Sequence, residues 1–466
     1  MNRTEIKPTT ENIIDMLEKD AIERNKYIAT FLEMLDNVEQ NFTIFINGDW
    51  GTGKTFLVKQ ISVLLTYYNQ YINKEIAQFM PQIENVLKRN EFKDLKLEKN
   101  FVPIYYNAWN NDSHIDPINS IIFNIIKEHN ILKDYQKESS DVIDKIASVL
   151  DMANIWSNGS IKELVSTFKG KDIIPEITTM ENLKETLNVL LDKLLEERGD
   201  KLVVFVDELD RCNPVYAIKL LERIKHFFDH ENIIFVFSVN VNELTNTIAN
   251  YYGQNFDSHR YLNKFFDVSI DLPQVNITNF MKFLGLDKNS YYFNETVFEI
   301  INHYHFTMRD CIRYYQSISI LEEFANTNSG YGFHEDKGRI IIRIFLLPLL
   351  LGIKIIDLKT YIDIINGNGY DKFIKAVKEI EIVRDGLKEY MNRDQEEKNS
   401  DESYNNQISG IYNAIFNHKA DSYKEYTNGV IELNMYSYDY MMESLSLLKK
   451  GLKYWKINCI LSKNKV

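Results

Sequence analysis

Residues 48–55 read Gly-Asp-Trp-Gly-Thr-Gly-Lys-Thr and fit the pattern G-x-x-x-x-G-K-[ST]. An apolar run at 43–46 precedes them and a helix-like segment at 56–61 follows, which predicts a strand, a loop and a helix in succession. Glycines at these spacings let backbone N–H groups turn toward one anion, and the helix start adds the positive end of its dipole. The stretch therefore predicts a phosphate-binding loop in an α/β fold. A structural glycine-rich turn is the alternative.

Each position of this loop has an expected partner. Lys54 is expected to contact the phosphates as a point charge, and the Thr55 hydroxyl to bind Mg²⁺. We expect ATP and Mg²⁺ as the cofactors, although ATP is favoured only weakly over GTP by the absence of a guanine-reading segment. The full set expected to bind the nucleotide from this stretch is Gly48, Asp49, Trp50, Gly51, Thr52, Gly53, Lys54, Thr55 and Phe56.

A second motif lies downstream, where the apolar run 201–206 ends in Asp207 and Glu208. A run that is apolar throughout predicts a central parallel strand, and its carboxyl end is where open α/β sheets bind ligands. Asp207 is expected to hold Mg²⁺ through its water shell, and Glu208 to orient and deprotonate the attacking water. An apolar strand that ends in two acids is common by itself. Together with the phosphate loop it favours hydrolysis of a nucleoside triphosphate.

Three further extended runs, at 101–106, 233–239 and 266–270, complete a predicted sheet of about five strands. Strands separated by helical segments are typical of a doubly wound parallel α/β domain. An extra strand between the phosphate-loop strand and the acidic strand marks the hydrolytic class, since kinase-type nucleotide binders set those two side by side. Asn240 has two interpretations, a sensor of the γ-phosphate or of the attacking water, and the cap of the next helix.

Five segments, in this order, resemble the KAP-type P-loop NTPases. The phosphate loop has the form G-x-W-G-x-G-K-[ST], and the other four segments are 106–109, 207–212, 261–266 and 308–313. The resemblance spans about residues 20–320. Glu208 stands where the family often has a second Asp, and Asn240 where it often has an Asp. Many members carry transmembrane helices between the two nucleotide motifs, but residues 140–180 are too polar to span, so the resemblance implies a soluble member.

The arginines that resemble family positions have open roles. Arg211 is expected either to contact a γ-phosphate across a subunit interface or to pair with Asp210. Arg309 and Arg313 share one face of a helical stretch, and Arg309 is expected to contact the nucleotide from a helical lid. The residues expected to be catalytic are Lys54, Glu208, Asn240 and Arg211, and the expected metal ligands are Thr55 and Asp207.

Helical spacing of apolar residues dominates the chain beyond Pro273. We predict an NTPase core with N-terminal helices at 1–275, a helical lid at 276–330 and an all-α C-terminal module at 331–466. A disordered loop is expected near 392–405, because residues 392–403 contain no apolar side chain. A further helical stretch is expected at 440–452.

Composition limits where such a chain can work. The three cysteines are far apart and lack metal-ligand spacing, which indicates a reducing compartment, and no signal segment opens the chain, so we expect a cytoplasmic protein. The apolar run 344–353 is too short to span a membrane and predicts a buried helix. The net charge of −13 does not indicate nucleic-acid binding, which is left open.

The expected function is that of an ATP-hydrolysing switch or remodelling motor that acts as a homo-oligomer or on a partner protein. The resemblance implies a prokaryotic protein and suggests a role in anti-phage defence. Two alternatives remain, a nucleotide-dependent oligomeric scaffold without significant turnover and a nucleic-acid-coupled ATPase.

Overall fold

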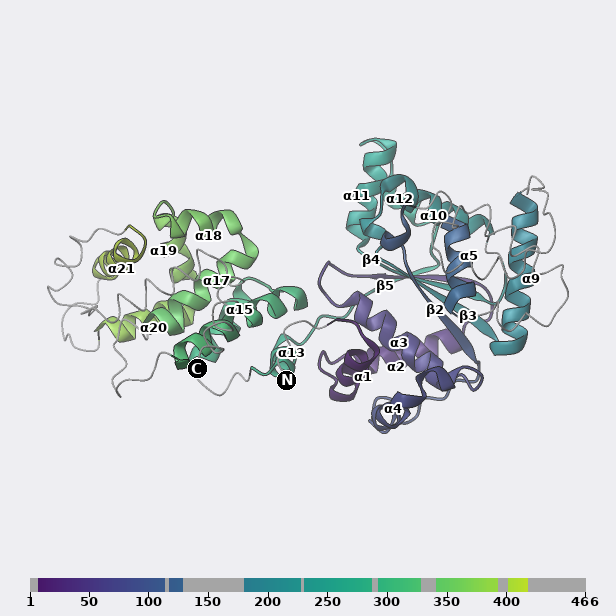
Figure 1. The fold of residues 1–466 in the computed structure, drawn as a ribbon. Helices are drawn as coiled ribbons and strands as arrows, with labels where there is room; N and C mark the ends of the chain where they lie inside the picture. Colours follow the sequence, from purple (N-terminus) through teal and green to yellow (C-terminus); the bar gives the residue numbers. More distant parts are fainter. Residues whose placement is uncertain are drawn as a thin grey trace, which may run out of the picture. The chain divides into compact units, whose positions relative to one another are not determined.

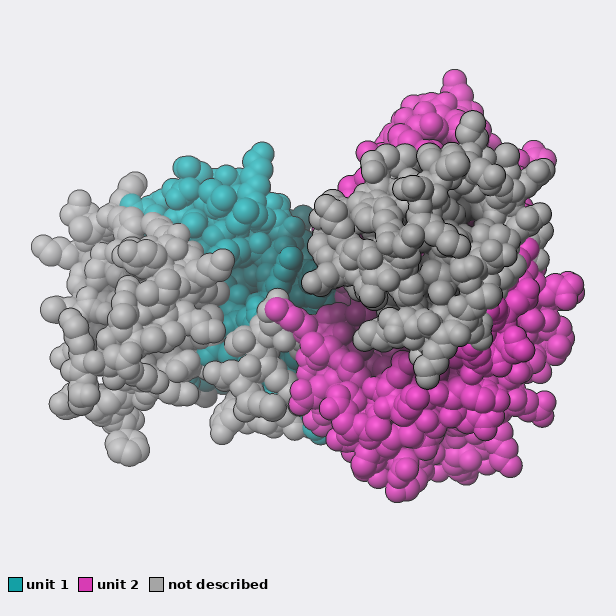
Figure 2. All heavy atoms as spheres, turned by 45° about the vertical axis from the view of Figure 1, so that its right-hand side comes forward, with its two compact units in different colours: residues 1–6, 276–466 teal, residues 7–275 magenta. Residues whose placement is uncertain are grey.

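The computed structural model describes residues 7–113, 117–128, 180–227, 230–286, 292–327, 341–392 and 401–417. Contacts divide the chain into two compact units, one at 7–275 and the other at 276–466 with residues 1–6. Figure 1 labels most of the helices and strands, and Figure 2 colours the two units. Most of residues 140–180 and all of the stretch 440–452 lie outside the described residues.

A five-stranded parallel sheet forms the centre of the unit at 7–275 (Figure 1). Its order is β2-β3-β4-β1-β5, so β4 separates the phosphate-loop strand β1 from the acidic strand β3, as predicted for a hydrolase. Every residue of β3 and β4 is buried, as expected for central strands covered on both faces. The strands are β1 (Phe42–Asn47), β2 (Phe101–Asn107), β3 (Lys201–Asp207), β4 (Ile233–Val239) and β5 (Val268–Asp271).

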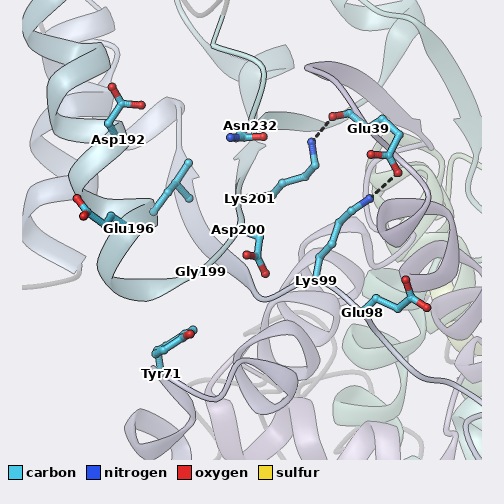
Figure 3. Close-up of a pocket in the computed structure, with 11 residues that line it drawn as sticks. Glu39, Tyr71, Glu98, Lys99, Asp192, Glu196, Gly199, Asp200, Lys201 and Asn232 are labelled. Atoms are coloured by element: carbon cyan, nitrogen blue, oxygen red, sulfur yellow. Dashed lines mark hydrogen bonds and ion pairs between the residues drawn. The ribbon is translucent and has the colours of Figure 1, made fainter.

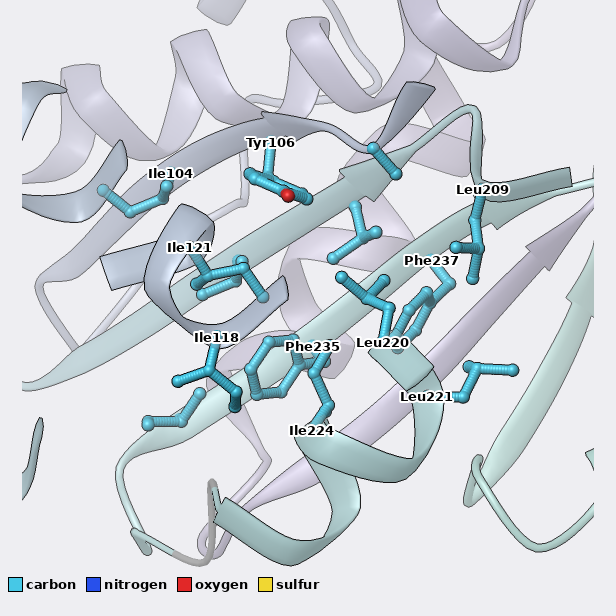
Figure 4. Close-up of a cluster of buried hydrophobic side chains, with 14 of the residues drawn as sticks. Ile104, Tyr106, Ile118, Ile121, Leu209, Leu220, Leu221, Ile224, Phe235 and Phe237 are labelled. Atoms are coloured by element: carbon cyan, nitrogen blue, oxygen red, sulfur yellow. The ribbon is translucent and has the colours of Figure 1, made fainter. Parts of the chain in front are cut away.

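Helices cover both faces of this sheet, and successive β3 residues alternate between the two cores. Val203 and Phe205 belong to the core under the first group of helices, whereas Val204 and Val206 belong to the second core, drawn in Figure 4. The first group is α1 (Thr10–Lys19), α2 (Asn25–Asp36), α3 (Lys54–Tyr68) and α4 (Met80–Leu87). The second group includes α5 (Pro117–Glu128), α9 (Met180–Arg198), α10 (Pro214–Phe227), α11 (Val241–Tyr252) and α12 (Ser258–Leu262).

The described part of the other unit consists of helices. The predicted buried helix at 344–353 falls in the π-helical turn η6 (Ile342–Leu346) and in α17 (Leu347–Ile356), whose residues through Ile353 are buried. No helix among the described residues is long and apolar enough to cross a membrane. The remaining helices are α13 (Ile277–Leu284), α14 (Tyr292–His303), α15 (Met308–Thr327), α18 (Leu358–Ile365), α19 (Tyr370–Glu379), α20 (Glu381–Asn392) and α21 (Asp401–Phe416).

The loop predicted near 392–405 overlaps a helix at its C-terminal end. Residues 393–400 lie outside the described part of the chain, but α21 already begins at Asp401. The end of the polar run at 392–403 is therefore helical.

Candidate nucleotide-binding site

Residues 48–53 form a loop between β1 and α3, at the carboxyl edge of the sheet (Figure 1). Gly51 and Gly53 have φ angles of 82° and 90°, which only glycine adopts at low cost. A Cβ atom at Gly48 would lie 3.2 Å from Leu272 Cβ and 3.2 Å from Thr52 Oγ1. Gly51 and Gly53 thus allow a left-handed backbone, and Gly48 allows close packing against Leu272 and Thr52. Such a loop, followed at once by a helix N-terminus, fits a phosphate group.

Lys54 is the first residue of α3 and is only 9 % exposed. Its Nζ donates hydrogen bonds to the carbonyl oxygens of Gly48 and Asp49, the latter at 3.1 Å. Burial lowers the pKa of Lys54, while the nearby carboxylates of Asp210 and Asp207 act in the opposite direction. The ammonium therefore lies against the phosphate loop, where sequence analysis expects it to act.

Asp207 ends β3 and is 1 % exposed. Its Oδ2 accepts hydrogen bonds from the Thr55 hydroxyl at 2.7 Å and from the Tyr105 hydroxyl at 2.9 Å. Burial, and then the charge of Asp207, raise the pKa of Tyr105, so its hydroxyl stays a donor. The hydroxyl of Thr55 and the carboxylate of Asp207 are hard oxygen ligands, which fit a Mg²⁺ ion that keeps most of its waters.

Glu208 follows Asp207 with a φ of 62°, an uncommon value for a residue with a side chain. Its N–H donates to Asp207 Oδ1 at 3.0 Å. Its Oε1 lies 2.7 Å from Nη1 of Arg211, and its Oε2 accepts a hydrogen bond from Nδ2 of Asn107 at 3.0 Å. Both oxygens of the expected water base are therefore engaged by neighbouring side chains.

Arg211 has a different partner from the one considered in sequence analysis. It pairs with Glu208 of its own chain, and its guanidinium lies 5.6 Å from the ring centre of Trp109. Among the described residues it forms no ion pair with Asp210, whose Oδ2 instead accepts from Trp50 Nε1 at 2.6 Å. The trans-acting role of Arg211 stays a prediction.

The same oxygen of Asp210 also accepts from the backbone N–H of Asn240 at 3.1 Å. Asn240 caps α11, because its Oδ1 accepts from the N–H of Glu243 at 3.2 Å. Its Nδ2 donates to Asp49 Oδ1 at 3.2 Å, which ties the cap to the phosphate loop. The structure thus shows the capping role of Asn240, and its sensor role stays a prediction.

The two remaining expected contacts lie elsewhere. Phe56 is partly buried and packs against the core under α1 to α4. Arg309 and Arg313 are exposed on α15, in the unit at 276–466, one helical turn apart as predicted. Contact of Arg309 with the nucleotide stays a prediction.

Three residues at this edge were not given a role by sequence analysis. Tyr105 and Asn107 lie on β2, and Asn107 is the register partner of Asp207. Arg24, 1 % exposed at the start of α2, donates to the carbonyl oxygens of Thr52 and Pro273. Asn107 falls within the family-like segment 106–109, which could have indicated it. Tyr105 and Arg24 stand in no sequence pattern that would have indicated a role.

A pocket of about 820 Å³ lies at the opposite edge of the sheet (Figure 3). Its lysines are engaged, since Lys201 Nζ donates to the Glu39 carbonyl oxygen at 2.7 Å and Lys99 Nζ lies 3.1 Å from Glu39 Oε1. The carboxylates of Glu98, Asp192, Glu196 and Asp200 also line it. Because the pocket is acidic and lies at the amino ends of the strands, it does not suit a nucleotide.

Comparison with known proteins agrees with this geometry. The family model of the KAP family P-loop domain matches residues 24–325, about two thirds of the chain. An uncharacterised protein of Methanocaldococcus jannaschii is 27% identical over 161 residues, which are 34% of this chain and 73% of that protein.

Proposed function

The chain belongs to the KAP family of P-loop NTPases, which implies nucleotide binding, and from its site we propose that it hydrolyses ATP. The observation that carries this proposal is the 2.7 Å hydrogen bond between Thr55 and Asp207, with Glu208 next in the chain. A phosphate loop, two Mg²⁺ ligands and a carboxylate base at one sheet edge are the parts that hydrolysis needs. A protein that only binds nucleotide has no need of the base.

We assign the binding roles by chemistry. The loop 48–53 and Lys54 would hold the phosphates, and Thr55 and Asp207 would hold Mg²⁺. The ion, when bound, neutralises charge on the phosphate oxygens. Asn240, which already bonds to Asp49 of the loop, would sense the γ-phosphate or the attacking water through its side-chain amide.

Glu208 would take the proton of the attacking water. Its Oε1 pairs with Arg211 and its Oε2 accepts from Asn107, so an attacking water would compete with these two partners for the carboxylate. An engaged base supports a switch, in which a partner or a second copy of the chain releases Glu208. Arg211, once released, could instead reach a γ-phosphate of a neighbouring subunit.

The part of the chain beyond residue 275 has proposed roles of its own. We propose that residues 276–330 form a helical lid from which Arg309 contacts the nucleotide, and that 331–466 form a module that binds a partner or assembles the oligomer. The resemblance to KAP-type NTPases supports a cytoplasmic, prokaryotic role in anti-phage defence, where ATP state would gate an effector.

The alternative is a nucleotide-dependent scaffold with little turnover, and the engaged state of Glu208 is the observation that favours it. A nucleic-acid-coupled ATPase receives less support, since the net charge is −13.

The deciding experiment is steady-state phosphate release from ATP by wild type, Lys54→Ala and Glu208→Gln over a range of protein concentrations. Turnover per subunit that rises with concentration and is lost in both variants would support a hydrolase completed by an oligomer. Tight ATP binding by wild type without turnover would favour the scaffold. Equal loss of binding and hydrolysis in Glu208→Gln would contradict the role of Glu208 as base.

A further inference from the structure

Arg24 joins the phosphate loop to the segment that follows β5. Its Nη1 donates to the carbonyl oxygen of Thr52 at 2.9 Å. Its Nε and Nη2 donate to the carbonyl oxygen of Pro273 at 3.2 Å and 2.6 Å. The side chain is 1 % exposed, and among the described residues no carboxylate forms an ion pair with it. A buried cation held only by carbonyl oxygens is costly, so the fold retains it at the expense of desolvation.

The turn between α1 and α2 fixes where Arg24 enters the site. Asp20 and Glu23 both have positive φ angles, of 45° and 53°. The buried Asn25 donates through Nδ2 to the Leu17 carbonyl oxygen at 2.8 Å, and through its backbone N–H to Asp20 Oδ1 at 3.2 Å. Arg24 thus extends from a turn that is held on both sides, which leaves its side chain little freedom to move.

The bond to Thr52 orients one peptide of the phosphate loop. A peptide bond is planar and trans, so the C=O of Thr52 and the N–H of Gly53 point in opposite directions. Arg24 holds the C=O on its own side, and the N–H of Gly53 is therefore directed away from Arg24. Gly53, with a φ of 90°, permits this arrangement.

The bonds to Pro273 connect this peptide to the last residues of the unit at 7–275. Leu272 donates its N–H to the Asn47 carbonyl oxygen at 2.7 Å, and its Cβ limits the space at Gly48. Only Gln274 and Val275 separate Pro273 from Asn276, where the other unit begins. A shift of the peptide between Thr52 and Gly53 would therefore move the rigid guanidinium of Arg24, and with it Pro273 near the end of this unit.

We propose that Arg24 is a positioning residue that orients the phosphate loop for ATP and couples the state of the loop to residues 272–275. The inference rests on the proposed binding of ATP. An arginine is needed because its planar fork reaches two carbonyl oxygens at once, whereas the ammonium of a lysine is a single point charge.

The test is hydrogen–deuterium exchange with and without a non-hydrolysable ATP analogue and Mg²⁺, on wild type and Arg24→Lys. Arg198→Lys is the matched control, because Arg198 is a largely buried arginine of the same unit at the end of α9. In wild type and the control we expect the analogue to slow exchange at 48–56 and at 272–275. In Arg24→Lys we expect about tenfold weaker binding, the loss that one charge-assisted hydrogen bond represents. At saturation, slowed exchange should return at 48–56 but not at 272–275.

The outcomes distinguish the proposed role of Arg24 from the proposed binding of ATP. Wild-type affinity together with a wild-type response at 272–275 in Arg24→Lys would overturn the role of Arg24 and leave ATP binding intact. No response at 48–56 in wild type would overturn ATP binding itself, and the inference with it. If Arg24→Lys does not fold, Arg24→Gln serves instead, because its amide can reach one carbonyl oxygen but not both.

Discussion

Nη1 of Arg211 lies 2.7 Å from Oε1 of Glu208, three residues earlier in the same chain. Because Asn107 occupies the other oxygen at 3.0 Å, the carboxylate has no oxygen left without a protein partner. The ion pair is partly exposed, and such pairs contribute roughly 1 kcal/mol or less. It is thus strong enough to hold a base at rest and weak enough for a partner to break.

Arg211→Ala is expected to raise the ATPase rate of dilute protein by about fivefold, the factor that about 1 kcal/mol represents. The reason is that, without the guanidinium, the attacking water no longer competes with Arg211 for the carboxylate of Glu208. Phosphate release at low protein concentration measures this, and Arg211→Lys, which keeps a cation beside Glu208, should change the rate less. A fall in rate that becomes larger as protein concentration rises would instead support action of Arg211 in a neighbouring subunit.

Trp50→Phe is expected to weaken ATP binding by about tenfold, since it removes the indole N–H that bonds to Asp210 but keeps an aromatic side chain. Trp50 is 45 % exposed, so the effect on folding should be small. Titration with a fluorescent ATP analogue measures the affinity. Trp109→Phe is the matched control, because Trp109 is 49 % exposed and, within the part of the chain that the structure describes, donates no hydrogen bond to Asp210. Unchanged affinity in Trp50→Phe would show that the bond to Asp210 does not shape the loop.

Removal of Mg²⁺ with EDTA is expected to weaken ATP binding to wild type by at least tenfold, because Thr55 and Asp207 would hold the ion. Asp207→Asn should bind ATP with similar weakness whether or not Mg²⁺ is present. Tyr105→Phe, which removes the other hydroxyl bonded to Asp207, should keep the response to Mg²⁺. Isothermal titration calorimetry with and without EDTA makes the comparison. A full Mg²⁺ response in Asp207→Asn would remove Asp207 from the ion site.

The sheet and the central pair of the site could be predicted because both depend on local pattern. Apolar runs marked the strands, and Thr55 and Asp207 meet because each stands at the carboxyl edge of a parallel sheet. Contacts set by side-chain direction could not be read this way. Three acids, Asp207, Glu208 and Asp210, lie within four residues of Arg211, and only the fold directs it to Glu208.

Arg24 shows a second limit of sequence reasoning. Its partners are carbonyl oxygens of Thr52 and Pro273, and every residue has a carbonyl group, so no residue type marks them. The left-handed backbone of Glu208 is equally hidden, since such a conformation is usually signalled by glycine or asparagine.

Lys54→Met is expected to raise the Tm of the nucleotide-free protein at pH 7 by about 2 °C while abolishing the stabilisation that ATP gives to wild type. Burial lowers the pKa of Lys54 below its ordinary value of 10.5, so the folded state binds this proton less tightly than the unfolded chain does. The penalty is therefore present at neutral pH and is relieved as pH rises from the lowered pKa toward 10.5. The difference in Tm between variant and wild type should shrink over that window.

Lys59→Met is the control, because burial also lowers the pKa of Lys59 on the same helix, and it should follow the same pH trend but keep the response to ATP. Thermal denaturation of wild type and both variants at pH 7 and pH 10, with and without ATP and Mg²⁺, measures the differences in Tm and the response to ATP. A Tm of Lys54→Met well below wild type at pH 7 would mean that the bonds of Lys54 to Gly48 and Asp49 outweigh its desolvation.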